Sequence, residues 1–424
     1  MPAEPSLEPS LLNVTVDSAR LLQQLEQLAS FSSDAAPAVT RVLYSPEDMA
    51  ARDFLKKEMA ALGLELHEDP LGTLFARWVG QDADAPAVAT GSHIDAIPHA
   101  GRYDGTVGVL GALEAFRALR AAGFQPRRSL ELILFTAEEP TRFGVGCLGS
   151  RAMASVLSPE DLRALRDDAG RDLDSLRQAC GFAGSLEQVA LRPGHYHAFI
   201  ELHIEQGPLL EQANIPIGVV SAIAAPATLH ITITGEGGHA GAVLMPARKD
   251  ALVAAAELAC AVENAARNSA SPDNVATVGK FEVHPGAVNS IPSRVFMTAD
   301  VRDIRLDTRD ASVEQIQQQA AAIAERRQVR IDVQLINADP PAQCGEAIIH
   351  SISQAAKAFD LAQQSMVSRA YHDALFMARL CPTGMIFIPC HEGISHRPDE
   401  YSSPEAIAAG VQVLAHSLAQ LSLS

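Results

Sequence analysis

The segment SLELILFTAEE, residues 129–139, gives the clearest indication of the fold. Its first eight residues are mostly leucine, isoleucine and phenylalanine, which is typical of a strand buried on both faces of a sheet. The segment then ends on two adjacent glutamates, Glu138 and Glu139. Because ligands bind at the carboxyl ends of strands in an open α/β sheet, the segment predicts a functional site at this edge.

The segments around this strand alternate between helical and extended patterns. Such alternation predicts an α/β fold with a mostly parallel sheet and helices on both faces. The apolar spacing predicts helices at 16–30, 47–62 and 106–122 and further strands at 73–79 and 87–92.

The middle of the chain follows a different pattern. Strand-like and helix-like segments there succeed one another in the order β-α-β-β-α-β, which is the ferredoxin-like arrangement. The strands are predicted at 228–234, 274–284, 294–302 and 329–336, and the helices at 246–268 and 310–327. We therefore expect an α+β domain at 224–338, inserted into a catalytic domain formed by 1–223 and 339–424.

Composition limits the classes of partner. The chain has 424 residues, which is long enough for two domains. Its formal net charge of −18, without a run of Lys or Arg, argues against nucleic acid and anionic membranes as partners. We find no apolar run as long as a membrane helix and no secretory signal. The six cysteines form no CxxC pair, which favours a reducing, cytoplasmic location.

A second polar segment is GSHIDAIPHAGRYDG, residues 91–105. His93 follows an apolar run, and Asp95 is a candidate hydrogen-bond partner for a metal-bound His93 imidazole. Asp104 lies in a turn flanked by glycines, where the backbone is free to aim its carboxylate. Taken alone, the segment is more typical of solvated turn residues.

The adjacent glutamates are more informative. Two ionised neighbours at a buried strand end are costly unless cations compensate them. In a two-metal site, one of Glu138 and Glu139 would bind a metal, and the other would take a proton from water. A solvated loop entrance explains the pair equally well, since strand ends often carry charge.

Two distant histidines complete the set of candidate ligands. His203 lies in FIELHIEQGP, and His396 in GISHRPDEYSS. Each alone is more typical of an ordinary core or loop residue. Together with the earlier candidates they provide the carboxylates and imidazoles that two divalent ions ~3.5–4 Å apart would use. The candidate metal ligands are His93, Asp104, Glu139, His203 and His396.

The order of these motifs resembles the two-metal aminoacylase/carboxypeptidase superfamily. ELHIEQGPLLE, GGHAG and GISHRPDEYSSPE resemble the branch of N-carbamoyl-L-amino-acid hydrolases, β-ureidopropionases, allantoate amidohydrolases and ureidoglycolate amidohydrolases. EEPTRFG, CLGSR and SRAYHDALFMAR are most similar to its ureidoglycolate amidohydrolase members. Other members carry Gly-His-Asp where this chain has Tyr371-His372-Asp373, a departure that disfavours allantoate and N-carbamoyl amino acids as substrates without excluding them. Tyr371 and His372 are candidate substrate contacts, with packing near the substrate as the alternative role.

The resemblance implies a role for each site residue. His93 and His203 would bind one metal, Glu139 and His396 the other, with Asp104 bridging and Glu138 as general base. Substrate contacts would come from Gln206, His239, Asn289 and Arg302.

Physical chemistry is compatible with the last three roles. Arg302 can bind a substrate carboxylate through two N–H groups, with Asn289 donating beside it. His239 can stabilise the oxyanion that forms when water attacks a carbonyl. Without the resemblance, His239 would be interpreted as a flexible glycine-loop residue and Arg302 as a surface ion pair with Asp303.

The implied reaction is hydrolysis of a ureido C–N bond in a small carboxylate. For (S)-ureidoglycolate, the products would be glyoxylate, ammonia and CO₂, a step of allantoin and purine breakdown. The resemblance favours Mn²⁺, whereas the ligand types also permit Zn²⁺, Co²⁺ or Ni²⁺. It further implies a homodimer formed through the inserted domain, which would act as a lid, with His239 reaching the partner's site.

Five alternatives remain open. The substrate could be an N-carbamoyl-L-amino acid or allantoate, and the same scaffold also supports dipeptidases and aminoacylases. A non-catalytic metal-dependent binding protein is a weaker hypothesis, because all six proposed ligand and base positions are filled.

Overall fold

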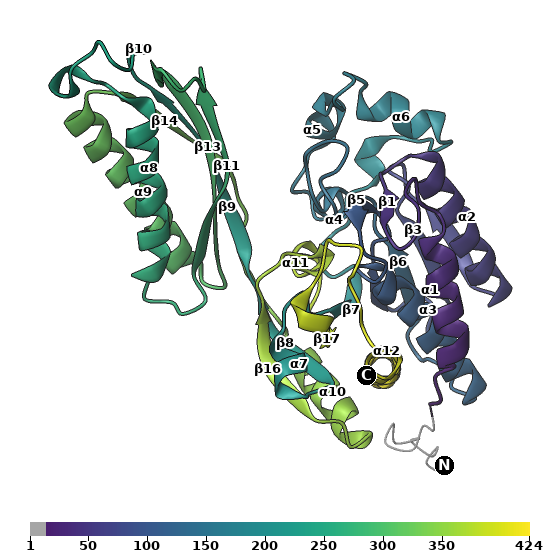
Figure 1. The fold of residues 1–424 in the computed structure, drawn as a ribbon. Helices are drawn as coiled ribbons and strands as arrows, with labels where there is room; N and C mark the ends of the chain where they lie inside the picture. The colour runs from purple at the N-terminus through teal and green to yellow at the C-terminus, as the bar shows by residue number, and fades with distance from the viewer. Residues whose placement is uncertain (1–13) are drawn as a thin grey trace. The chain divides into compact units, whose positions relative to one another are not determined.

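The computed structural model describes residues 14–424, which form two compact units (Figure 1). The second unit comprises Ala222–Gln343 together with Val367–Tyr371, and the first comprises the remaining described residues. The segment Val367–Tyr371 is hydrogen-bonded to the rest of the second unit: the N–H of Ala224 donates to the carbonyl of Ser368 at 2.8 Å. The sequence-based boundaries at 223/224 and 338/339 did not include this segment.

The larger sheet has nine strands in the order β15-β8-β17-β7-β4-β6-β3-β2, with β16 paired to β8. The neighbouring pairs β17–β7, β7–β4 and β4–β6 are parallel, whereas the pairs β17–β8, β8–β15, β6–β3 and β3–β2 are antiparallel. The sheet is therefore mixed rather than mostly parallel. Its strands are β2 (Glu65–Glu68), β3 (Leu74–Trp78), β4 (Ala87–Ser92), β6 (Leu130–Leu134), β7 (Tyr196–Ile204), β8 (Ile217–Ile223), β15 (Ala342–Gln343), β16 (Gln363–Ser368) and β17 (Thr383–Ile388).

Helices of the first unit bury the apolar residues of this sheet. α3 is buried over most of its length, and it packs with α12 against β7 and β4. Local signals fix the helix starts; for example, Ser45 caps α2 by accepting the N–H of Asp48. The helices are α1 (Ser18–Ala29), α2 (Pro46–Ala61), α3 (Thr106–Ala121), α4 (Leu148–Met153), α5 (Pro159–Ala164), α6 (Leu173–Ala179), α7 (Leu209–Ala213), α10 (Glu346–Ala358), α11 (Asp373–Met377) and α12 (Pro404–Leu423).

The C-terminal helix α12 corrects one expectation from the sequence. Within the described part of the chain, it is long and apolar enough to cross a membrane by length and composition. Most of it is buried against the rest of the protein, as is typical of the core helix of a folded domain.

The second unit contains a four-stranded antiparallel sheet in the order β11-β13-β9-β14. Figure 1 shows α8 and α9 on one face of this sheet. Alternate residues of β9, namely Leu229, Ile231 and Ile233, are buried against these helices in a separate apolar core. The elements are β9 (Ala225–Thr234), α8 (Ala251–Arg267), β11 (Val275–His284), β13 (Arg294–Asp303), α9 (Leu306–Arg327) and β14 (Arg330–Ala338).

Both predicted helix starts in this unit were wrong, and α9 begins at Leu306 rather than at residue 310. We expected a helix from residue 246, but α8 begins at Ala251. The side chain of Asp250 accepts the N–H groups of Leu252 and Val253, so it caps the helix there.

Candidate metal centre

Four adjacent strands position the candidate ligands. His93 directly follows β4, the two glutamates follow β6, His203 is the penultimate residue of β7, and His396 follows β17. These four strands are neighbours and run parallel, so their carboxyl ends meet at one edge of the sheet. Asp104 reaches the same edge from the turn that precedes α3.

The first ligand group contains His93, Asp104 and His203. Oδ1 of Asp104 lies 3.4 Å from Nε2 of His93 and 3.1 Å from Nε2 of His203. Both imidazoles are almost completely buried. The sequence pattern alone could not distinguish His203 from an ordinary core histidine, whereas the structure directs its Nε2 towards Asp104.

The second ligand group contains Asp104, Glu139 and His396. Nε2 of His396 lies 3.3 Å from Oδ2 of Asp104 and 3.2 Å from Oε1 of Glu139. Asp104 thus uses one carboxylate oxygen in each group. The structure brings all five predicted metal ligands together, with Asp104 shared between the two groups.

The donor set and the space around it fit divalent cations. Within each group the candidate ligand atoms all lie within 4.8 Å of one another. Gly105 has φ +65°, and a Cβ at this position would lie 2.5 Å from the His93 ring. Only glycine therefore lets the turn bring Asp104 so close to His93. Imidazole and carboxylate ligands suit Mn²⁺, Zn²⁺, Co²⁺ and Ni²⁺.

The charged groups of the centre depend on one another. Burial alone would raise the pKa of Asp104, but contacts with His203, His396 and His93 hold it well below its usual range. Hydrogen bonds to Asp104 and Glu139 raise the pKa of His396 to about 10. These contacts show that the cluster already favours positive charge beside its carboxylates.

Glu138 has a different environment from Glu139. It is buried, and its Oε2 lies 4.0 Å from Nε2 of His93. Burial, together with the nearby Glu139 and Asp373 carboxylates, raises the pKa of Glu138 well above its usual range, although His93 opposes the shift. A carboxyl group that readily holds a proton, next to a ligand cluster, is suited to acid–base chemistry.

The structure corrects the expected partner of His93. Nδ1 of His93 lies 3.0 Å from the main-chain oxygen of Asp95 and 3.7 Å from its carboxylate. The Asp95 carboxylate instead accepts the backbone N–H groups of Glu138 at 3.2 Å and Glu139 at 2.9 Å. Asp95 therefore orients the glutamate pair, which no sequence pattern indicated.

The sequence did not indicate several other hydrogen bonds around the ligand cluster. The Ser395 hydroxyl lies 2.8 Å from Oδ2 of Asp104, beside the predicted substrate residue Gln206, whose amide donates to the same atom at 2.6 Å. The buried Glu201 accepts the hydroxyl of Ser92 and the backbone N–H of Ala374. Glu201 lies within strand β7 and Ser395 in a loop. Neither the periodicity of the strand nor a motif indicates the polar contacts of these two residues.

Tyr371 and His372 lie in different units. The His372 ring is buried, and its centroid lies 4.4 Å from that of His203. This contact places His372 next to the first ligand group. Tyr371 belongs to the second unit, where its ring lies 5.7 Å from the Arg302 guanidinium.

The second unit holds its four predicted site residues in two separate pairs, Arg302 with Tyr371 and His239 with Asn289. His239 lies in β10 (Gly238–His239), which pairs with β12 (Ser290–Ile291), and the N–H of Ala240 donates to the carbonyl of Asn289. This pair of strands adjoins the start of β13, because the N–H of Gly235 donates to Ser293.

Arg302 lies near the far end of β13, so eight residue steps, roughly 26 Å, separate it from Arg294. Its Nε donates to Asp300 at 2.7 Å, and not to Asp303 as the alternative interpretation had it. A small molecule therefore cannot contact His239 and Arg302 of the same chain at once.

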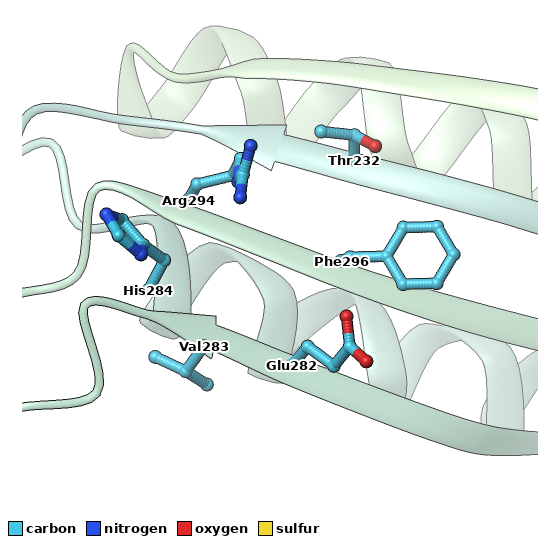
Figure 2. A pocket seen from close by; sticks show the side chains of 6 residues that line it. All are labelled: Thr232, Glu282, Val283, His284, Arg294 and Phe296. Carbon is cyan, nitrogen blue, oxygen red and sulfur yellow. The ribbon is translucent and has the colours of Figure 1, made fainter.

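A separate pocket of about 440 Å³ lies on the sheet of the second unit (Figure 2). Arg294, His284 and Phe296 project from neighbouring strands around it. None of the predicted metal or substrate residues lines this pocket.

Comparisons with known proteins agree with this geometry. The family model of the peptidase family M20/M25/M40 matches residues 89–420. A ureidoglycolate hydrolase of Oryza sativa subsp. japonica is 54% identical over 96% of this chain and 85% of its own length. An N-carbamoyl-L-amino acid amidohydrolase of Geobacillus stearothermophilus is 37% identical over 96% of this chain and 99% of its own.

A solved structure is similar over the same extent. The crystal structure of AtUAH in complex with (S)-hydroxyglycine superposes with a TM-score of 0.88 at 50% identity, covering 98% of this chain and 100% of that one. The family match covers most of the chain, including the segments that carry all five candidate ligands. This chain is a member of the peptidase family M20/M25/M40.

Proposed function

We propose that this protein is a two-metal amidohydrolase that hydrolyses (S)-ureidoglycolate. The observation that carries the proposal is the position of Asp104 between two ligand groups, with Glu138 beside them. The similarity to a ureidoglycolate hydrolase and to a structure holding (S)-hydroxyglycine supports the substrate. (S)-Hydroxyglycine is the amine that remains when the carbamoyl group of (S)-ureidoglycolate is removed by hydrolysis.

The metal ions would be held by the two groups. His93 and His203 would bind one, Glu139 and His396 the other, and Asp104 both. Two divalent ions in these positions would polarise the ureido carbonyl and make a water molecule more acidic. We favour Mn²⁺, with Zn²⁺, Co²⁺ or Ni²⁺ as alternatives, because oxygen and imidazole ligands accept all four.

Glu138 would move the proton. Its carboxylate takes a proton from the attacking water and later gives it to the nitrogen that leaves the carbonyl carbon. Breaking this C–N bond releases a carbamic acid fragment, which decomposes to ammonia and CO₂, and an amino-hydroxy acid, which eliminates a second ammonia to give glyoxylate. The buried environment that raises the Glu138 pKa supports this role, because the group must hold the proton between the two steps.

Substrate binding would involve residues of both units. Arg302 can form two parallel hydrogen bonds to a carboxylate, and Asn289 can add another. His239 would donate to the oxyanion formed at the ureido carbon. Gln206 already donates to Asp104 and would orient the substrate beside the metals. His372, whose ring lies tilted against that of His203, is a further candidate contact.

We also propose a cytoplasmic homodimer formed through the second unit, which would act as a lid. The separation of roughly 26 Å along β13 supports this assembly, since His239 and Arg302 of one chain cannot serve the same small substrate. In a two-fold dimer, each chain would supply His239, and Asn289 beside it, to the other chain's site.

One experiment tests the proposed substrate. Purified protein reconstituted with Mn²⁺ is offered (S)-ureidoglycolate, allantoate, N-carbamoyl-L-amino acids and dipeptides, and product release is recorded. We expect kcat/KM to be highest for (S)-ureidoglycolate. The similarity to an N-carbamoyl-L-amino acid amidohydrolase makes those compounds the second candidate class, and a preference for them would replace the proposal.

A further inference from the structure

Glu400 connects the two loops that carry Asp104 and His396. The residue is only 4% exposed. Oε1 accepts the backbone N–H groups of Tyr103 at 2.7 Å and of Asp104 at 3.1 Å. Although almost 300 residues separate Glu400 from these partners, the bonds fix the main chain of Asp104 itself.

The other carboxylate oxygen reaches the same site through a side chain. Oε2 of Glu400 accepts the hydroxyl of Ser395 at 2.8 Å, and this hydroxyl also lies 2.8 Å from Oδ2 of Asp104. Ser395 directly precedes His396 in the chain. Glu400 therefore contacts the backbone of the shared carboxylate residue and the neighbour of the second histidine at once.

The turn before Asp104 is shaped to admit this carboxylate. A Cβ at Gly101 would lie 2.3 Å from Cβ of Glu400 and 2.4 Å from its Oε1. Any larger residue at position 101 would push the turn and the carboxylate apart. The rings of Tyr103 and Tyr401 meet edge to face at 6.0 Å and hold the same two segments together.

We propose that Glu400 is a positioning residue that holds Asp104 and His396 in the geometry needed to bind two divalent ions. The inference rests on the proposed metal-dependent function and deepens it. The hydrogen bonds of Glu400 go to the backbone of Tyr103 and Asp104 and to the Ser395 hydroxyl. It acts through the backbone of Asp104 and through Ser395, as hydrogen-bond partners of metal ligands commonly do.

The test compares two replacements of Glu400. Glu400→Gln keeps an oxygen for the two backbone N–H groups, and its amide can donate to Ser395, leaving the Ser395 hydroxyl for Asp104. Glu400→Ala removes all three contacts. Mn²⁺ binding is measured by chelator competition on metal-free protein, and the electron paramagnetic resonance spectrum reports whether the two ions are coupled.

We expect Glu400→Ala to weaken binding of at least one Mn²⁺ by about 10- to 100-fold and to lose the coupled spectrum. The Mn²⁺ affinities of Glu400→Gln should stay within about threefold of the wild-type values. A tenfold change in affinity corresponds to about 1.4 kcal/mol. Gly101→Ala should behave like Glu400→Ala, because it displaces the same carboxylate without removing it.

Asp167→Ala is the matched control. Asp167 is similarly buried, and one of its oxygens accepts two backbone N–H groups, those of Ala169 and Arg171. Its loss should lower the free energy of unfolding but leave both Mn²⁺ affinities unchanged. If Glu400→Ala is insoluble, Gly101→Ala and Ser395→Ala give the same comparison.

The outcomes separate the two proposals. Wild-type protein that binds fewer than two Mn²⁺ overturns the proposed metal function and the role of Glu400 with it. Wild-type protein that binds two, with affinities and spectrum unchanged in Glu400→Ala and Gly101→Ala, overturns only the positioning role. Equal losses of Mn²⁺ affinity in Glu400→Ala and Glu400→Gln would also overturn the positioning role.

Discussion

Oδ1 of Asp104 lies 3.1 Å from Nε2 of the buried His203, while its second oxygen faces His396 from the other side. Because one carboxylate serves both ligand groups, its removal should affect both metal positions. We predict that Asp104→Ala loses binding of both ions, whereas His396→Ala, which alters one group, retains one. Metal content after dialysis, measured by atomic emission, checks the difference.

Chelation provides the corresponding test of activity. Removal of metal from the wild-type protein should abolish turnover, and Mn²⁺, Co²⁺ or Zn²⁺ should restore it. Full activity in metal-free protein would contradict the two-metal proposal.

Glu138→Gln should separate metal binding from chemistry. The amide has nearly the same shape as the carboxyl group but cannot take a proton from water. We expect near-normal binding of metal and substrate, with kcat lower by ~10²–10⁴, the usual contribution of a general base. Glu139→Gln should lose metal instead. The opposite pattern would mean that the roles of the two glutamates are exchanged.

Asp95→Asn tests how the glutamate pair is held. The Asp95 carboxylate accepts the N–H of Glu138 on one oxygen and that of Glu139 on the other, and an Asn side chain in the same orientation keeps only one of these two oxygens. Leaving one buried N–H without its acceptor should lower the free energy of unfolding by about 1–3 kcal/mol. We also expect a lower kcat, because Glu138 loses its fixed position. Urea unfolding and steady-state kinetics check both, and an unchanged free energy of unfolding would show that the amide rearranges.

These site residues differ in how far the sequence predicted them. His93, Glu138, Glu139 and His396 follow apolar runs, and the position of such polar residues at strand ends can be derived from the pattern. His203 lies within a strand, so its pattern equally fits a core residue. Only the strand order, which depends on contacts between distant segments, directs it towards Asp104.

Other features could not be derived for a physical reason. Parallel and antiparallel buried strands share the same apolar composition, so the antiparallel pairs formed by β3 and β8 were not predicted. Asp95, Ser395 and Glu400 act through hydrogen bonds to backbone or to other side chains, and no residue spacing records such bonds. The distance between His239 and Arg302 follows from the length and direction of β13, which only the structure gives.

Arg302 should determine the preference for a carboxylate substrate. Its guanidinium already binds Asp300 at 2.7 Å and lies over the Tyr371 ring, so it is held in place before substrate arrives. Arg302→Ala should lower kcat/KM more than Arg302→Lys, although lysine cannot make the two-pronged contact. A substrate analogue without the carboxylate should be poor for wild type and almost insensitive to the replacement. Equal losses for both compounds would mean that Arg302 has only a structural role.

The separation of His239 from Arg302 leads to a prediction about assembly. If His239 acts in the partner's site, Glu138→Ala and His239→Ala homodimers should both be inactive, because every site lacks one of the two groups. In a mixed dimer, one site carries both defects and the other carries neither. Random assembly makes about half of the dimers mixed, so co-expression of the two variants should recover about a quarter of wild-type activity.

The control is a pair of variants that cannot complement. Glu138→Ala and Asp104→Ala affect the same ligand cluster of the same chain, so each site of their mixed dimer keeps one defect. Differently tagged chains purified through both tags would prove that mixed dimers form. Because Asn289 adjoins His239, Asn289→Ala should complement Glu138→Ala in the same way. If mixed dimers of Glu138→Ala with His239→Ala form and remain inactive, His239 does not act across the interface. Within one chain, the roughly 26 Å along β13 already keeps His239 and Arg302 apart. With action across the interface also excluded, the two residues would share no site.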